Sequence, residues 1–171
     1  MGYVPQDQFL FATSILDNIR FGNPNLHLSA VEEATKLAQV YQDIVAMPKG
    51  FDTLIGEKGV SLSGGQKQRL AMSRAMILDP AILILDDSLS AVDAKTEYAI
   101  IDNLKEMRKD KTTIITAHRL SAVVHADLIL VLQNGQIIER GTHEDLLAID
   151  GWYSQTYQSQ QLEMKGEEDA E

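Results

Sequence analysis

The pattern of apolar and polar residues in this chain changes at Pro80. The segment before Pro80 is predicted to be mainly helical, and after it short apolar runs alternate with helical segments. Residues 81–85 are all apolar, which predicts a strand buried on both faces in a parallel sheet. Together these features predict an α/β fold, in which a parallel sheet core carries a helical subdomain on its N-terminal side.

Turn and capping residues mark the ends of the predicted elements. Pro80 ends one helix, and Asn134-Gly135 between two apolar runs predicts a hairpin. A serine or threonine followed three residues later by an acid or glutamine predicts helix starts at Ser29, Ser63 and Thr142. The predicted helices span residues 29 to about 40, a further segment to about 47, 63 to about 78, about 94 to 107, and 120–124. Another helix opens at 142–145, and the last one contains Trp152. The predicted strands are one ending within 3–6, then 81–85, 112–116, 128–132 and 136–139. In the helix 94–107 the core-facing positions are Ala99, Ile100, Leu104 and Met107.

The turn Ser63-Gly64-Gly65-Gln66 combines a helix start with two glycines. A helix N-terminus presents N–H groups and the positive end of the helix dipole, and so favours anions. Glycines in its first turn remove side chains that would keep an anion away from the backbone. We therefore predict that Ser63, Gly64, Gly65 and Gln66 bind phosphate. The alternative is a glycine-rich turn before an ordinary helix.

Composition excludes several classes of protein. The 171 residues suffice for one domain with a core, and the absence of cysteine rules out disulfides and thiolate metal sites. No segment approaches the roughly 20 apolar residues of a membrane span, and the N-terminus does not resemble a signal peptide. The net charge of −10 argues against nucleic-acid binding. Five acids and one lysine within residues 163–171 predict an acidic, disordered tail over 161–171.

Three titratable side chains are predicted to meet at one edge of the sheet. Asp86 and Asp87 follow strand 81–85, and His118 comes just after strand 112–116. Ligands of parallel sheets bind at the carboxyl ends of the strands. There Asp86 suits Mg²⁺, Asp87 could act as a base on water, and His118 could bind a γ-phosphate. Taken singly, paired acids are often helix caps and a lone histidine is often structural.

Six ordered motifs resemble those of the nucleotide-binding domain of ATP-binding cassette (ABC) exporters. Leu62 to Gln66 is similar to the signature motif, and residues 81–87 are similar to the Walker B strand. Four loops resemble, in order, the Q-loop, the exporter X-loop, the D-loop and the H-loop: residues 4–7, 56–59, 90–93 and 116–119. The resemblance extends from residue 1 to about 160. It implies a C-terminal portion of such a domain, with a helical subdomain at about 8–80 and the sheet core and C-terminal helices at 81–160.

The resemblance implies a P-loop NTPase-like core that uses ATP and Mg²⁺ at the cytoplasmic face of the cell membrane. The expected catalytic residues are Asp87, His118 and Gln6, and Asp86 and Gln6 are the expected metal-binding residues. Asp93 joins the signature residues in binding nucleotide. The expected partners are a second ABC subunit and a transmembrane domain on the same parent chain. No Gly-x-x-x-x-Gly-Lys-Ser/Thr loop occurs in the 171 residues, so the chain is expected to be a fragment that is inactive alone.

Asp87 departs from the family pattern, because these proteins usually carry glutamate there. Aspartate is one methylene shorter, which moves its carboxylate back by about 1.5 Å. The change resembles the degenerate subunit of heterodimeric exporters, in which one of the two ATP sites hydrolyses slowly. In the family, domains pair head to tail, so an intact signature would serve the partner's site. The alternatives are a homodimer in which aspartate suffices, a soluble DNA- or ribosome-associated ABC ATPase, and a non-catalytic regulatory subunit.

Overall fold

The computed structural model describes the backbone of residues 1–56 and 60–168, and side chains as far as residue 163. Residues 57–59 of the X-loop-like stretch and 169–171 of the predicted tail lie outside the described residues. The chain divides into two compact units, Met1–Ala117 and His118–Glu171. Each unit is described by itself.

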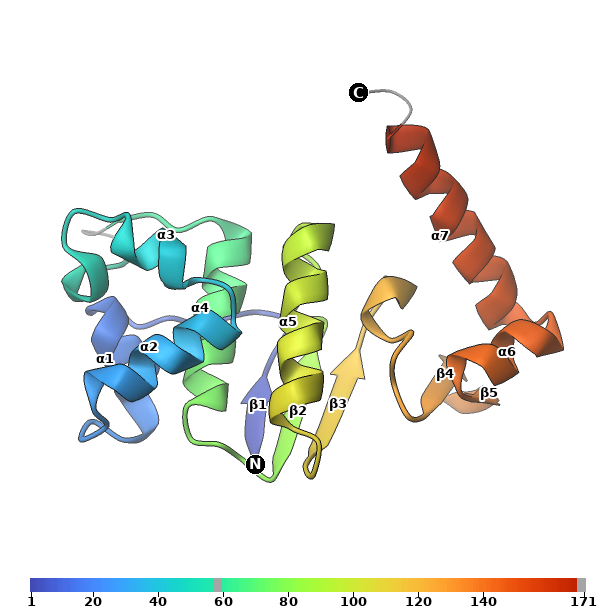
Figure 1. Ribbon diagram of the computed structural model, residues 1–171, viewed down its shortest axis with the longest axis horizontal. Coiled ribbons are helices and arrows are strands. Elements are labelled where there is room, and N and C mark those ends of the chain that lie inside the picture. Colours follow the sequence, from blue (N-terminus) through green and yellow to red (C-terminus); the bar gives the residue numbers. More distant parts are fainter. Residues whose placement is uncertain (57–59, 169–171) are drawn as a thin grey trace. The chain divides into compact units, whose positions relative to one another are not determined.

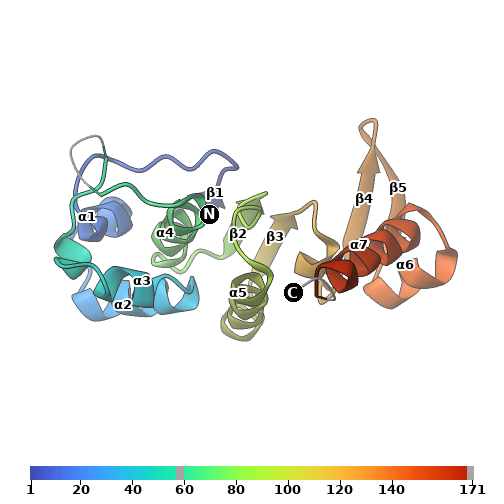
Figure 2. The same cartoon turned by 90° about the horizontal axis from the view of Figure 1, so that it is seen from above.

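The first unit contains the predicted parallel sheet, and its strands lie in the order β1-β2-β3 (Figure 1). Its strands are β1 Gly2–Val4, β2 Ile82–Asp86 and β3 Thr112–Thr116. The helix α4 contacts β1 and β2, and α5 lies along one face of the sheet (Figure 2). The helices of this unit are α1 Ile15–Ile19, α2 Leu28–Leu37, α3 Tyr41–Val45, α4 Gly64–Met76 and α5 Ala94–Met107, with short 3₁₀ turns η1 Arg20–Gly22 and η2 Gly50–Asp52.

The sheet is buried on one face, which corrects the expectation that residues 81–85 are covered on both. Leu83 and Leu85 of β2 are fully buried on the side of the helices. Tyr3, Ile84 and Ile114 form one row across the opposite face, where Tyr3 and Ile114 are about half exposed. Within the described residues of this unit, the helices cover only the face of Leu83 and Leu85.

Two helix details differ from the sequence prediction. The helix α2 begins at Leu28 with His27 as its N-cap residue, so Ser29 lies inside the first turn and does not cap it. His27 already has extended backbone angles, and its carbonyl accepts the first helical bonds from Ala30 and Val31. In α5, Ile100 and Leu104 are buried as predicted and Ala99 is half-buried, but Met107 is 52% exposed because it lines a pocket at this end of the helix and not the packed core.

The second unit is a hairpin covered by two helices. Strands β4 Ile129–Gln133 and β5 Gln136–Gly141 are antiparallel, and their turn at Asn134 and Gly135 has positive φ at both residues. This confirms the predicted hairpin. The unit also contains the turn η3 Leu120–Ala122 and helix α6 His143–Ile149, which opens with the predicted capping box of Thr142 and Asp145. Its core consists of Leu120, Ile129, Val131, Leu146 and Tyr153.

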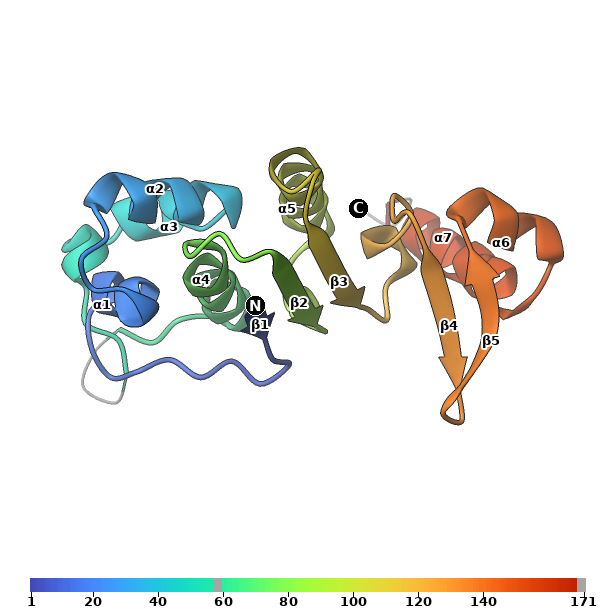
Figure 3. The ribbon, with the colours of Figure 1, turned by 90° about the horizontal axis from the view of Figure 1, so that it is seen from below.

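The last helix, α7 Trp152–Glu168, extends into the segment predicted to be a disordered tail. Its first turn is fixed by Glu139, whose carboxylate accepts bonds from the N–H groups of Trp152 and Tyr153. Once a helix is nucleated, each added residue costs little, and residues 161–165 favour helices. Residues 161–168 are therefore helical despite their acidic composition. Figure 3 shows α7 beside α6.

Candidate functional site

The glycine-rich turn at Ser63 starts the helix α4, as predicted. The hydroxyl of Ser63 accepts the N–H of Gln66 at 3.2 Å, and the side chain of Gln66 accepts the N–H of Ser63 at 3.0 Å. This reciprocal pair satisfies two backbone donors at the helix start. Ser63 and Gly64 are exposed, so the positive end of the α4 dipole faces solvent. The geometry suits an anion.

Asp43 of helix α3 holds this turn from the side. Its carboxylate accepts one bond from Gln66 Nε2 at 2.9 Å and pairs with Arg69 Nη1 at 2.9 Å. Both bonds link α3 to the first two turns of α4. The orientation of Gln66 is therefore set by α3 as well as by the capping box. Sequence reasoning missed Asp43, because nothing in the local pattern places α3 against α4.

Gly65 allows the start of α4 to contact the loop that follows β2. A Cβ at Gly65 would lie 2.7 Å from the carbonyl oxygen of Ala91, and a Cβ at Gly64 would lie 3.3 Å from the Ala91 side chain. Real Cβ atoms do not approach a backbone oxygen this closely. From the sequence we predicted that both glycines leave the backbone open to an anion. The structure adds that Gly65 is required for helix-to-loop packing within this chain.

Asp86, at the end of β2, is held by two hydroxyl groups. Thr116 Oγ1 donates to one carboxylate oxygen at 2.7 Å, and Tyr3 Oη donates to the other at 3.0 Å. The hydrogen bond from Thr116 is the main cause of the lowered pKa of Asp86, and the bond from Tyr3 is the second cause. The same bond between Tyr3 and Asp86 raises the pKa of the Tyr3 hydroxyl. Asp86 is therefore ionised at neutral pH and offers the hard oxygen ligand that Mg²⁺ prefers. Its neighbours Tyr3 and Thr116 come from the two flanking strands.

Asp87 adopts a left-handed backbone conformation with φ of 45°. Its N–H donates to the carbonyl and to the hydroxyl of Thr116, at 3.1 and 3.0 Å. Ser90 Oγ donates to the Asp87 carbonyl at 2.9 Å. Aspartate tolerates this conformation better than most residues. These bonds turn the chain sharply at the end of the strand and direct the carboxylate to the same edge as Gln6.

Gln6 and Asp87 meet at this edge of the sheet, a contact that the sequence analysis did not predict. Gln6 Nε2 donates to Asp87 Oδ2 at 3.1 Å. Gln6 follows β1 and Asp87 follows β2, so the contact joins the carboxyl ends of two neighbouring parallel strands. Gln6, Asp86 and Asp87 thus form a polar cluster where a ligand of a parallel sheet binds.

Asp93 has a structural role in this chain. Its side chain caps the helix α5 by accepting the N–H of Thr96 at 2.9 Å. That bond is the main cause of the lowered pKa of Asp93. Asp93 is exposed, and its predicted contact with nucleotide remains a prediction.

His118 is the first residue of the second unit and directly follows Ala117. Its carbonyl accepts a bond from Gln160 Nε2 of α7 at 2.9 Å, and Gln160 Oε1 accepts the N–H of Leu120 at 2.9 Å. The side chain of Gln160 therefore holds the backbone on both sides of Arg119. The predicted role of His118 at the phosphate stays a prediction.

With this geometry in place, the comparisons with known proteins identify the family. Residues 1–90, more than half of the chain, match the family model described as ABC transporter. The chain belongs to the ABC transporter family. This confirms the family resemblance that the motifs predicted.

Two similar relatives of this ABC chain carry multidrug resistance in their names. It is 56% identical over 162 residues to the probable multidrug resistance ABC transporter ATP-binding/permease protein YheI of Bacillus subtilis. It is 47% identical over 163 residues to the multidrug resistance-like ATP-binding protein MdlA of Escherichia coli. Each match covers 95% of this chain and 28% of the relative. The ABC chain therefore spans about a quarter of the length of these proteins.

A solved structure confirms the fold of the ABC chain. The structure of a bacterial Atm1-family ABC exporter with ATP bound superposes with a TM-score of 0.87 at 42% identity. The match covers 93% of this chain and 28% of the exporter chain. The predicted α/β, P-loop NTPase-like class is thereby confirmed. Among the described residues, no helix is both long and apolar enough to cross a membrane.

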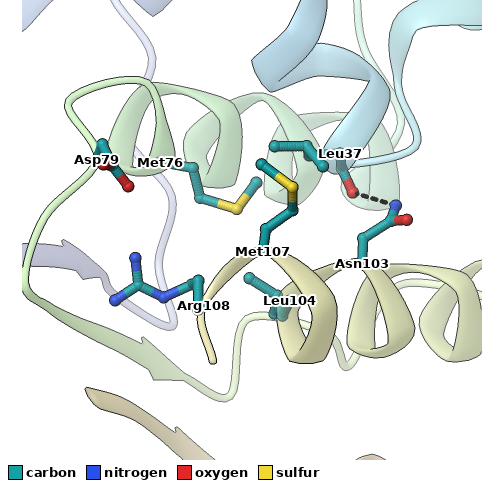
Figure 4. A pocket seen from close by; sticks show the side chains of 7 residues that line it. All are labelled: Leu37, Met76, Asp79, Asn103, Leu104, Met107 and Arg108. Carbon is teal, nitrogen blue, oxygen red and sulfur yellow. Dashed lines mark hydrogen bonds between the residues drawn. The ribbon is translucent and has the colours of Figure 1, made fainter. Parts of the chain in front are cut away.

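A small pocket in the first unit is separate from the cluster of Gln6, Asp86 and Asp87 (Figure 4). It lies where β2 and β3 begin, next to Asp79 and Arg108, whereas Asp86 and Asp87 follow the opposite end of β2. Its volume of about 40 Å³ holds a few waters at most and no nucleotide. The side chains that line it are Leu37, Met76, Asp79, Asn103, Leu104, Met107 and Arg108.

Proposed function

We propose that this chain contributes to ATP binding and hydrolysis that drives export across a membrane, together with a second ABC subunit. The observation that carries the proposal is that the first unit contains two half-sites, which are two separate groups of residues that would each form half of an ATP site. Gln6, Asp86 and Asp87 converge at the ends of β1 and β2, and an exposed anion-binding turn opens at Ser63. The similarity to exporters carrying the name multidrug resistance supports export. We also propose a transmembrane domain on the same parent chain and a place at the cytoplasmic face of the membrane, which the name ATP-binding/permease protein of one relative supports.

The residues of the β2 edge fit Mg²⁺ and ATP chemistry. Asp86 is an ionised carboxylate held by two hydroxyl groups, and it suits a metal that keeps several waters. ATP bound there with Mg²⁺ would supply the phosphate that is cleaved. Asp87, held through Gln6 and its fixed backbone, would orient and deprotonate water, and His118 would stabilise charge on the phosphate. The turn at Ser63 would bind the phosphates of ATP held by the partner.

The shorter carboxylate of Asp87 leads us to propose an asymmetric heterodimer. A general base contributes about 10²–10⁴-fold to rate, or roughly 3–5 kcal/mol, and a retracted carboxylate forfeits much of it. The signature residues Ser63, Gly65 and Gln66 are intact, so they would complete the fast site of the partner. Asp86, Asp87 and His118 would belong to the slow site.

Replacing Asp87 with asparagine is expected to change the ATPase turnover of the intact heterodimer less than about twofold. Asparagine keeps the size of the side chain and tolerates the same left-handed backbone, so only the charge at the slow site is lost. The measurement is steady-state phosphate release by the purified parent transporter. Asp79→Asn is the matched control, because Asp79 also has positive φ but lies before β2.

If Asp87→Asn eliminates turnover while Asp79→Asn does not, the aspartate is the working base and the asymmetric proposal is wrong. The homodimer would then be the correct assembly. Two other functions remain as alternatives: a soluble DNA- or ribosome-associated ABC ATPase, and a non-catalytic regulatory subunit. Only 56 residues separate Gln6 from Ser63, which leaves no room for the long coiled coil of chromosome-associated members.

A further inference from the structure

The amide of Gln68 connects helix α4 to the loop after β2. Gln68 Nε2 donates to Ser90 Oγ at 3.1 Å, and the N–H of Ala91 donates to Gln68 Oε1 at 3.0 Å. Gln68 is only 4% exposed. Both ends of this buried amide are therefore used, and both bind the same two-residue segment of the loop.

The same loop segment touches both proposed half-sites. On one side, Ala91 lies against Gly65, where no side chain longer than hydrogen fits. On the other, Ser90 Oγ donates to the carbonyl of Asp87 at 2.9 Å. A continuous set of contacts thus runs from the turn at Ser63, through Gln68 and Ser90, to the backbone of Asp87. All of these residues lie in the first unit.

Burying a glutamine side chain at position 68 costs free energy unless its amide forms hydrogen bonds. A buried amide is stable only when its hydrogen bonds are made, and removing it would leave the N–H of Ala91 without this acceptor. An apolar side chain of similar length would fill the space without linking the helix to the loop. The hydrogen bonds, and not the volume of the side chain, distinguish Gln68 from such a residue.

We propose that Gln68 is a positioning residue that sets the signature turn against the loop 88–92 and so aligns it for the partner's ATP. The inference rests on the proposed function of Ser63 in the partner's site. Gln68 itself does not touch the proposed ligand. It acts by fixing where Gly65 and Ser63 lie relative to the end of β2, which the short capping box alone cannot do.

The test uses the intact transporter with its partner and four variants. Gln68→Met keeps the length of the side chain and loses both hydrogen bonds, so kcat/KM for ATP is expected to fall roughly tenfold, the value of one to two neutral hydrogen bonds. Gln158→Met is the matched control, since Gln158 is exposed on α7; it should retain wild-type turnover. Thermal unfolding of each variant shows whether the fold is kept.

Gln68→Glu gives the readout that a purely structural role would not move. Burial raises the pKa of a carboxyl group, and a protonated glutamic acid can donate to Ser90 and accept from Ala91 as glutamine does. Its kcat/KM relative to wild type should therefore rise as pH falls, whereas that of Gln68→Met should stay level with pH. If Gln68→Met does not fold, the pH profile of Gln68→Glu tests the inference by itself.

Each result has one meaning. A tenfold loss in Gln68→Met with low-pH recovery in Gln68→Glu supports the inference. Wild-type turnover in Gln68→Met, or a pH profile of Gln68→Glu parallel to wild type, overturns it. Ser63→Arg, assayed in parallel, distinguishes failure of this inference from failure of the proposed function. If Ser63→Arg also keeps full turnover, the proposed function of the signature turn fails and this inference fails with it; if only Ser63→Arg is inactive, the inference alone is wrong.

Discussion

Ser63→Arg is expected to lower the ATPase turnover of the assembled transporter by about 100-fold or more. Ser63 is exposed at the N-terminus of α4, where its hydroxyl and the following N–H groups would bind the partner's ATP. Removing a donor aimed at developing charge costs about 10²–10³-fold in rate. Arginine also fills the space beside Gly64 with a long side chain. Phosphate release by the purified complex measures the effect.

Two further variants separate catalysis from folding in this experiment. Ser63→Ala removes the cap and leaves the space open, so it should cost about 1 kcal/mol of stability with a smaller loss of turnover. Ser61→Arg places the same cation two residues earlier, outside the capping box, and should be nearly as active as wild type. Retention of more than a third of wild-type turnover by Ser63→Arg would show that this turn does not complete an ATP site.

The 171-residue chain by itself is expected to show no ATPase turnover above background and no tight ATP binding. Its sequence contains no Gly-x-x-x-x-Gly-Lys-Ser/Thr loop, whose backbone amides and lysine supply most phosphate binding in this class of protein. The exposed turn at Ser63 offers only one helix end, and Asp86 and Asp87 repel phosphate unless a metal is bound. Phosphate release and calorimetric titration with Mg-ATP measure both properties.

The intact parent transporter, assayed in the same buffer, is the positive control for this expectation. Circular dichroism and thermal unfolding of the short chain establish that the polypeptide is folded during the assay. Turnover by the folded 171-residue chain, abolished in its Asp86→Ala variant, would contradict the expectation. The phosphate-binding elements would then lie within these residues, in an arrangement that the motifs do not predict.

The sequence predicted those elements whose signals are local. The capping box at Ser63, the helix Ala94–Met107 and the hairpin at Asn134-Gly135 depend on residues a few positions apart, and the structure confirms each of them. The sequence also placed Asp86 and Asp87 at the carboxyl end of a parallel strand, whereas the contact of Asp87 with the distant Gln6 was not predicted.

Contacts between distant segments could not be predicted in this way. Tyr3 reaches Asp86 because β1 lies beside β2, and Asp43 reaches Gln66 because α3 packs near α4. The burial of β2 on one face depends on which helices cover the sheet, whereas the sequence shows only that residues 81–85 are all apolar. The helix over residues 161–168 continues one that is fixed at its start by Glu139, more than twenty residues away, which the composition of 161–168 does not reveal.

Identifying the subunit that binds the parent protein is the most direct test of the asymmetric heterodimer. The native parent protein would be purified from membranes by an affinity tag, and the complex analysed by intact mass and peptide sequencing. We expect a parent several times heavier than 19.0 kDa, bound to a second ABC subunit that carries glutamate after its Walker B aspartate. A parent paired only with itself would contradict the asymmetric assembly, and a 19.0 kDa species found only in the soluble fraction would contradict export altogether.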